Sequence, residues 1–221
     1  MTVAPLRVFV SVPVAGFRVA YAREYWETYP CPPPSTVYGM LLSAVGERDR
    51  LVHRGAEIAV AMLSKPARSV VLRRVWRVKD KKRGPGLGAN VRPDFQELLT
   101  GVRLCVWVRK GGSADGRCGV PLVERLRRAL RQPAEVKRFG GLALGESTHL
   151  VDEIRSWRAE DPGRGLLLVG AEVGSLTLPV WADHVGAKGT RWGQFNLTEN
   201  DPLPNSPCKS AWISIEPPSQ E

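Results

Sequence analysis

A cluster of arginines around one tryptophan is the feature of this sequence that points most clearly to a chemistry. Trp76 lies between Arg73, Arg74 and Arg77. A guanidinium group pairs with phosphate through two parallel hydrogen bonds and also stacks on flat rings, and an indole stacks on nucleobases. The chain has 24 arginines against 8 lysines. The cluster therefore favours a nucleic acid as ligand, and the alternative is a tryptophan that packs across a sheet among solvated arginines.

The positive charge of the chain is concentrated in its middle third. The 221 residues carry a formal net charge of +10. Residues 65–138 hold 20 basic and 6 acidic residues, whereas residues 1–64 hold 6 and 5 and residues 139–221 hold 6 and 11. Such a local excess predicts a surface that binds a polyanion, and the alternative is a merely soluble surface. A hydrophobic content of 43% is sufficient for a packed core, so the composition excludes a mainly disordered chain.

Residues suited to catalysis are scarce. A metal-independent ribonuclease needs an acid and a base, and histidine is the usual choice near neutral pH. The three histidines, His53, His149 and His184, all lie outside the basic segment, and each is interpreted as a structural or surface imidazole. Their spacing from the four cysteines is not that of a zinc site, and no P-loop or G-x-S-x-G motif is present. We therefore expect no catalytic residue, metal or cofactor.

Strand-forming segments must position the arginine cluster. Residues 6–12 alternate apolar and polar side chains, which predicts a core strand, and residues 57–63 and 102–108 are also predicted strands, the last half-buried. Residues 70–78 have high strand propensity but carry arginines on both faces, so we expect neither face to be covered. This segment is predicted to be one arm of a projecting hairpin with a mobile basic tip at residues 79–88.

Two helices complete the predicted domain. The apolar stripe of residues 37–45 predicts a helix with Ser35 as its N-cap, and residues 121–132 predict a second one. The order strand, helix, strand, hairpin, strand, helix is consistent with an α+β, ferredoxin-like sheet backed by two helices. We divide the chain into a domain of residues 1–150, with the hairpin at about 70–100, and a smaller β-rich C-terminal part of residues 151–221.

The start of the first helix is a candidate phosphate site. Prolines precede it, and Ser35, Thr36 and Tyr38 place hydroxyl groups beside amides at the positive end of the helix dipole. The alternative is an ordinary capped helix.

Three motifs resemble one known family. The run from Phe17-Arg18 to Gly46, which includes YPCPPPSTVYGMLL at residues 29–42, is similar to the N-terminal signature of the CRISPR-associated Cas-five family. RPDFQELL at residues 92–99 and FGGLALGES at residues 139–147 resemble the same family in the same order. The resemblance covers roughly the first 150 residues. It implies an RRM-like (ferredoxin-like) fold with a protruding β-hairpin thumb.

The resemblance also implies a function. The protein would be a non-catalytic subunit of a type I Cascade surveillance complex that binds the 5′ handle of the CRISPR guide RNA and caps the Cas-seven backbone. The large Cas-eight type subunit would be a further partner, and target DNA would be met through the complex. The N-terminus has no secretory signal or membrane span, so we expect a cytoplasmic protein without membrane contact.

Two other functions remain as alternatives. Some members of the family cut precursor RNA with a tyrosine, lysine and histidine group, so a metal-independent endoribonuclease is the main alternative. Here the first helix ends Ala44-Val45-Gly46-Glu47 without that tyrosine, and no lysine and histidine pair follows the hairpin, so we expect no cleavage. A general RRM-like RNA binder outside CRISPR is less favoured because no aromatic RNP-type strand motif is present.

The charge pattern and the resemblance together give the candidate RNA-binding residues. They are Arg18, Ser35, Thr36, Tyr38, Arg73, Arg74, Trp76, Arg77, Lys79, Lys81, Lys82, Arg83, Arg92 and Arg138.

Overall fold

One large antiparallel sheet and two helices make up an α+β fold, as the element order predicts. The computed structural model describes residues 4–112, 115–116, 119–182 and 189–218. The helices are α1 (Pro34–Ala44) and α2 (Leu122–Arg131). The strands are β1 (Leu6–Ala15), β2 (Tyr25–Trp26), β3 (Glu57–Met62), β4 (Ala67–Trp76), β5 (Val91–Arg109), β6 (Glu153–Ser156), β7 (Gly165–Gly170), β8 (Leu176–Ala182), β9 (Thr190–Asn200) and β10 (Ile213–Ser214).

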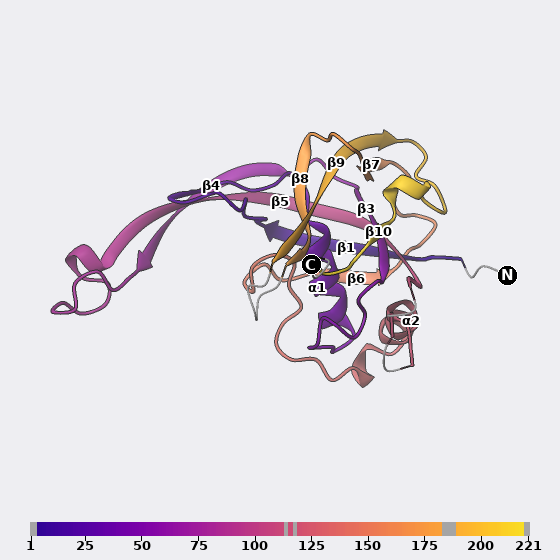
Figure 1. The fold of residues 1–221 in the computed structure, drawn as a ribbon, viewed down its shortest axis with the longest axis horizontal. Coiled ribbons are helices and arrows are strands. Elements are labelled where there is room, and N and C mark those ends of the chain that lie inside the picture. Colours follow the sequence, from indigo (N-terminus) through magenta and orange to yellow (C-terminus); the bar gives the residue numbers. More distant parts are fainter. Residues whose placement is uncertain (1–3, 113–114, 117–118, 183–188, 219–221) are drawn as a thin grey trace.

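The strands join in the order β6-β1-β5-β3-β7-β9-β8. Each neighbouring pair in this path is antiparallel, and β5 lies between β1 and β3. Both helices lie on the same side of the sheet, because their apolar residues share one core with the inward-facing residues of β1 and β5. Figure 1 shows this body of sheet and helices, with a long hairpin that leaves it on one side.

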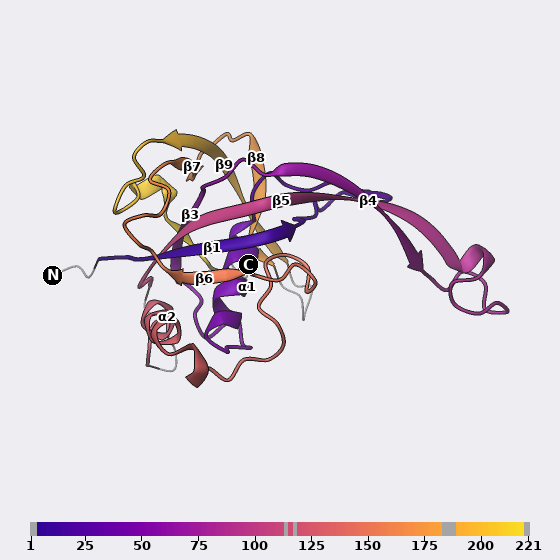
Figure 2. The same cartoon turned by 180° about the vertical axis from the view of Figure 1, so that it is seen from behind.

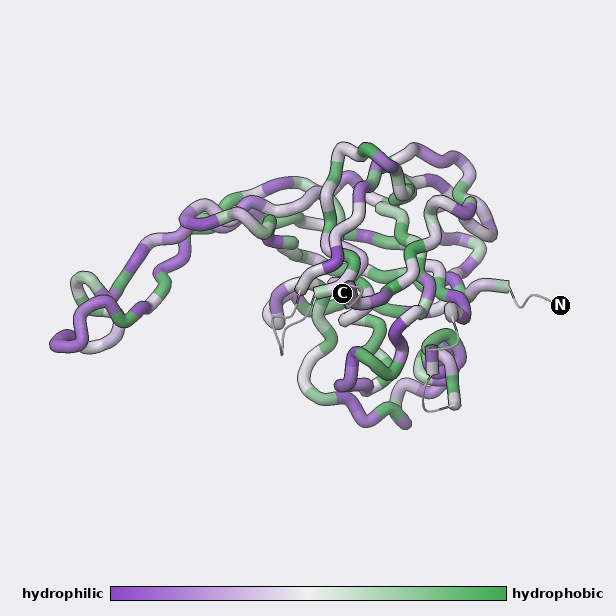
Figure 3. Tube along the Cα trace, in the orientation of Figure 1, coloured by the Kyte–Doolittle hydropathy of each residue, from purple (hydrophilic) through white to green (hydrophobic). Residues whose placement is uncertain are grey.

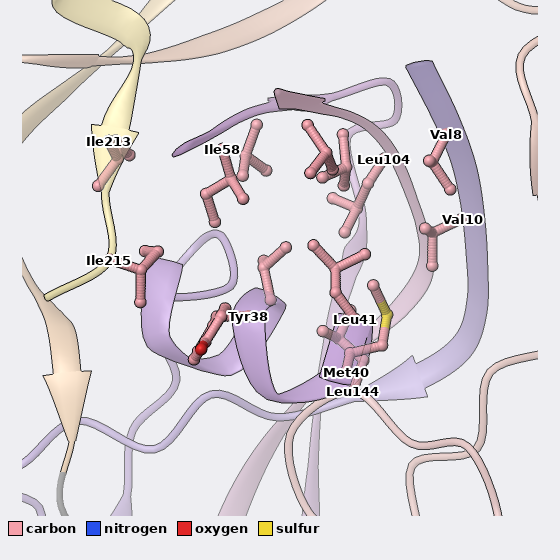
Figure 4. Close-up of a cluster of buried hydrophobic side chains, with 14 of the residues drawn as sticks. Val8, Val10, Tyr38, Met40, Leu41, Ile58, Leu104, Leu144, Ile213 and Ile215 are labelled. Atoms are coloured by element: carbon pink, nitrogen blue, oxygen red, sulfur yellow. The ribbon is translucent and has the colours of Figure 1, made fainter. Parts of the chain in front are cut away.

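The main core lies between the sheet and the helices. Val8 and Val10 of β1 and Leu104 of β5 alternate toward it, and Leu41 of α1 meets them there (Figure 4). These side chains are fully buried, which accounts for the period-two and helical apolar patterns of the sequence.

The opposite face of the sheet is covered as well, which corrects the prediction that residues 102–108 are half-buried. Cys105 and Trp107 of β5 point away from the helices, yet both are fully buried. Leu203, Trp157 and Trp212, all from the C-terminal part of the chain, pack on this second cluster. The sequence suggested a solvated face because the covering residues lie about 50 to 100 positions away in the chain.

The projecting hairpin comprises β4 and the first half of β5, residues 67–100. The register runs from Ala67 opposite Thr100 to Trp76 opposite Val91. Because β5 continues into the body of the sheet, the hairpin is a direct extension of a central strand. Figure 2, in which the molecule is seen from behind, shows the hairpin extending to the right of the body. In Figure 3 hydrophilic residues gather at its far end, while hydrophobic ones recur along its stem.

The C-terminal part continues the same sheet. β7 pairs with β3, and β9 and β8 follow, so that β8 packs against α1. Consequently α1 is buried on several sides, including at Tyr38, whose ring lies 6.1 Å from that of Trp181. The division of the chain at residue 150 stays a prediction.

Candidate nucleic-acid interface

The tip of the projecting hairpin is a loop built around Asn90, and the mobility expected of it stays a prediction. Asn90 is fully buried. Its Oδ1 accepts hydrogen bonds from the amides of Lys79 and Asp80 at 2.8 and 2.7 Å. Its Nδ2 donates to the carbonyls of Asp80, Arg83 and Gly84 at 2.8, 2.9 and 3.3 Å. One side chain thus satisfies the backbone groups of a loop that has no core of its own.

The cations of this loop point into solvent. Lys79, Lys81 and Lys82 are exposed, and their ammonium groups meet no carboxylate in the part of the chain that the structure describes. Arg83 lies 3.4 Å from Asp80, and the Arg77 guanidinium donates to the carbonyl of Ala89 at 3.1 Å. The loop therefore presents several positive charges close together, which is an arrangement suited to a phosphate chain.

The two faces of the hairpin stem differ, which corrects the prediction that neither is covered. Arg74 and Trp76 lie on an open face, and Trp76 is 70% exposed. Arg73 lies on the other face, where it is only half-exposed. Its guanidinium donates to Gln96, lies 3.4 Å from Glu146, and stacks over Trp26 at 4.7 Å.

Arg18 and Arg92 are engaged with neighbouring residues of this protein. Arg18 also lies over the Trp26 ring, at 4.1 Å, and donates to the carbonyl of Ala22 at 2.7 Å. The Nε of Arg92 lies 2.7 Å from Oδ1 of Asp94, a residue that is 1% exposed. Arg92 also lies 3.9 Å from Glu24, so Arg73 and Arg92 each join the hairpin to residues outside it. Their role as RNA contacts, which the sequence predicted, would require these local contacts to be shared or exchanged.

The start of α1 differs from the predicted phosphate site. Pro33, not Ser35, is the N-cap, and no side chain caps the helix. The amides of Thr36 and Val37 donate to the carbonyl of Pro33 at 2.9 and 3.1 Å, and Ser35 is 5% exposed. The helix terminus therefore offers few free donors to a ligand.

Tyr38 is a core residue rather than a surface contact. It is fully buried, and its hydroxyl donates to the carbonyl of Arg50 at 2.6 Å. Burial raises the pKa of this phenol, which is therefore neutral. Of the three hydroxyl residues predicted here, only Thr36 is partly accessible.

Arg138 is exposed but does not belong to the hairpin. It follows Lys137, whose carbonyl packs against Gly46 at the end of α1. The Phe139 ring that comes next lies 4.4 Å below the guanidinium of Arg48. The structure therefore separates Arg138 from the cluster at the hairpin tip.

Two of the three histidines, His53 and His149, are buried and have hydrogen-bond contacts within the protein. His53 is fully buried, with Nδ1 3.0 Å from Asp115 and Nε2 3.0 Å from Arg125. Nδ1 of His149 accepts hydrogen bonds from the amides of Gly16 and Glu146, both at 3.2 Å. Burial lowers the pKa of His149, an effect that Glu146 opposes and Arg73 reinforces, so the ring is neutral. His184 lies outside the described residues.

Sequence reasoning missed the residues that shape the interface. Asn90 was assigned only to the returning strand, and Glu146 and Gln96 were noted only within motifs. Gln96 is 5% exposed, and its Nε2 donates to Glu146 at 2.8 Å, which ties the hairpin to the segment after α2. The signal that could have suggested this contact is the presence of both residues in the motifs at 92–99 and 139–147.

Comparisons with known proteins agree on one family. The sequence profile of the family described as "CRISPR-associated protein (Cas_Cas5)" matches residues 6–154. A protein of Myxococcus xanthus (strain DK1622), named CRISPR-associated protein Cas5, is 46% identical over 191 residues, which are 86% of this chain and 88% of that protein.

Solved structures are similar in fold. A chain of a structure titled "CRISPR RNA-guided surveillance complex" superposes with a TM-score of 0.58 at 16% identity, over 89% of this chain and 90% of that one. A second, titled "Crystal structure of Cas protein", gives a TM-score of 0.51 at 16% identity, over 89% and 93%. Within the described ranges, neither α1 nor α2 is long and apolar enough to span a membrane.

Proposed function

Because this chain belongs to the Cas5 (Cas-five) family of CRISPR-associated proteins, we propose that it is a non-catalytic, guide-RNA-binding subunit of a type I Cascade surveillance complex. In this role it binds the 5′ handle of the guide RNA and caps the backbone of Cas-seven type subunits in the cytoplasm. A Cas-eight type subunit is a further partner, and target DNA is reached through the complex. The strand order β6-β1-β5-β3, with both helices on one face, supports an RRM-like, ferredoxin-like domain.

The observation that carries the proposal is the loop at the tip of the projecting hairpin. Lys79, Lys81 and Lys82 are exposed cations on a loop whose backbone Asn90 fixes. A loop backbone that is already held in one conformation need not be ordered when a phosphate binds, and contacts between cations and phosphates supply most of the affinity for a nucleic-acid backbone.

The closed sheet face also favours the hairpin as the RNA-binding element. In an RRM, aromatic side chains of the central strands stack on bases. Here the corresponding aromatic residue of β5, Trp107, is fully buried in a cluster on which Trp157 and Trp212 from the C-terminal part pack, and the guanidinium of Arg7 lies 5.3 Å from its ring. A base could reach it only if that cover were removed. The hairpin, by contrast, presents Arg74, Arg77 and Trp76 directly to solvent.

The contacts of the two histidines that the structure describes, His53 and His149, support a role without catalysis. In His53 both ring nitrogens are engaged, and the ring is fully buried. Nδ1 of His149 accepts two backbone hydrogen bonds. An acid or base for RNA cleavage must reach the ribose hydroxyl or the leaving oxygen, and a fully buried ring such as that of His53 cannot do so.

A binding experiment with labelled guide RNA tests the proposal. Replacing Lys79, Lys81 and Lys82 with glutamine should weaken binding roughly tenfold or more, and should lower the slope of log affinity against log salt by about 2, since each contact with a single strand contributes about 0.7. The matched control replaces Lys110, Arg131 and Lys209 with glutamine. It removes the same amount of positive charge at exposed positions outside the hairpin.

Two results would contradict the proposal. The first is an equal loss of affinity in the tip and control variants, because it would mean that only net charge matters. The second is a defined cut in a repeat-containing transcript incubated with the protein and a metal chelator, because it would make the protein the endoribonuclease.

A further inference from the structure

A groove of about 840 Å³ opens where the projecting hairpin leaves the body, beside β8 and β9 (Figure 1). We call it the root groove. Its walls include Arg68 and Glu97 from the hairpin, Tyr21, Glu27 and Tyr29 from the segment between β1 and α1, and Trp192 from β9. Pockets that hold small ligands commonly have volumes of about 300 to 1,000 Å³, so the root groove is large enough for one.

The aromatic side chains of the root groove are accessible to a ligand. Tyr21 is 77% exposed and Trp192 43%, and Tyr29 is partly exposed. The face of an aromatic ring attracts a cation that lies over it. Arginines of this chain lie over several other rings, such as Arg73 over Trp26 at 4.7 Å. Among the described residues, no cation of the chain lies over any of the three rings of the groove.

Two carboxylates give the root groove a negative charge. Glu97 accepts hydrogen bonds from the Tyr25 hydroxyl at 3.2 Å and from the Thr28 amide at 3.0 Å, and it lies 3.5 Å from Arg68. Glu27 is exposed and meets no cation in the part of the chain that the structure describes. Arg68 is the one cation among the described lining residues, so two carboxylates and one guanidinium leave a charge of −1, in a chain of +10.

The two carboxylates act on the same region. Desolvation raises the pKa of the Tyr25 hydroxyl, and the negative charges of Glu97 and Glu27 raise it further. An anionic ligand such as a nucleotide is disfavoured here, because its phosphate would meet Glu27 while Arg68 is already paired with Glu97. An organic cation is favoured, because its ammonium groups can meet a carboxylate and its methylene groups can lie against aromatic rings.

We propose that the root groove binds an aliphatic polyamine of the spermidine class. One ammonium group meets the carboxylate of Glu27, and the alkylammonium chain lies along the rings of Tyr21, Tyr29 and Trp192. The inference does not depend on the proposed function, because the groove and its charges belong to the free chain. A polyamine that binds only the folded chain would also stabilise it by mass action.

The test uses the full chain freed of nucleic acid, because RNA itself attracts polycations. Calorimetry at constant ionic strength measures the binding of spermidine, and AMP and magnesium chloride serve as comparison ligands. The variants Glu27→Gln and Tyr21→Leu change exposed side chains, and melting curves without ligand check that both remain folded. The matched control, Glu124→Gln, removes the same charge from an exposed position on α2.

Spermidine should bind with a Kd on the order of 1 mM or tighter. Its affinity should fall about threefold to tenfold in Glu27→Gln and in Tyr21→Leu, and should stay within about twofold in Glu124→Gln. Melting curves should shift upward with spermidine in the wild type and less so in these two variants.

Several results would overturn the proposal. One is the absence of saturable binding at about 10 mM spermidine, and another is an equal loss of affinity in Glu124→Gln, because only net charge would then matter. Affinity unchanged in Tyr21→Leu, or displacement by an equal concentration of Mg²⁺, would reduce the site to its carboxylates. Saturable binding of AMP that Glu27→Gln strengthens would identify a nucleotide as the occupant. None of these measurements involves guide RNA, so a failure here is distinct from a failure of the proposed function.

Discussion

Replacing Asn90 with alanine is the sharpest perturbation of the hairpin tip. The substitution removes two acceptor contacts, to the amides of Lys79 and Asp80, and three donor contacts, to the carbonyls of Asp80, Arg83 and Gly84. The two polar atoms of one buried side chain hold the loop, so no other residue can take over all of these contacts.

The magnitude follows from the number of bonds. A hydrogen bond contributes about 1 kcal/mol net, and the longest of the five is weak, so the tip should lose about 3 to 5 kcal/mol of local stability. Because 1.4 kcal/mol is a factor of ten, the amides of Lys79 and Asp80 should exchange with solvent roughly a hundred to a few thousand times faster, or reach the rate of an unprotected amide. The melting temperature should change little, since the tip lies outside the core.

Hydrogen exchange, followed by NMR or mass spectrometry, measures this loss of local stability. The affinity for guide RNA should also fall, by about threefold to tenfold, because the backbone that carries the cations loses its fixed conformation. The matched control is Asn205→Ala, which removes one exposed hydrogen bond, at 3.3 Å from Arg7. Unchanged protection of the tip in Asn90→Ala would refute the reasoning that this side chain organises the loop.

Further predictions concern pH, packing and thiol reactivity. The folded protein holds His149 with a lowered pKa, so the unfolded chain binds more protons below about pH 6.5 and stability should fall as the pH drops. His149→Asn keeps an acceptor in place of Nδ1 without titrating, and a melting curve against pH should be flatter for it; an identical slope would contradict the assignment. Leu41→Ala should lower the free energy of unfolding in urea by about 2 to 5 kcal/mol, because the side chain is fully buried, and a loss below about 1 kcal/mol would contradict this packing. A thiol reagent should label Cys208 and leave Cys31 and Cys105 unmodified in the folded protein, because burial raises the pKa of both to about 12; fast labelling of either would show that the core opens.

Local sequence patterns predicted the elements whose burial is set by near neighbours. β1 and α2 appear within a few residues of their expected bounds, because alternation and helical spacing reflect a single buried face. The hairpin was predicted from the arginines of residues 70–78 and the glycine-rich turn that follows. The projection of the hairpin from the body could therefore be predicted from the sequence. The unequal burial of its two faces could not.

The errors come from contacts between distant parts of the chain. Tyr38 was assigned to a ligand site because its spacing gives no indication that β8 covers α1 from the other side. Trp107 was expected on a half-buried sheet, and residues such as Trp212 cover it instead. β9 was missed because Gly193 and polar residues interrupt its alternation. Asn90 could not be recognised because a buried asparagine and an exposed one look alike in a sequence.

The central claim is that guide RNA lies on the tip of the projecting hairpin and not on the sheet face. Ultraviolet cross-linking of the chain to guide RNA, followed by mass spectrometry of the linked peptides, tests this most directly. The account predicts cross-links at Trp76 and within residues 77–83, and their loss when Lys79, Lys81 and Lys82 are replaced with glutamine. Cross-links that instead centre on Trp107 or Trp212, with none in the hairpin, would contradict it.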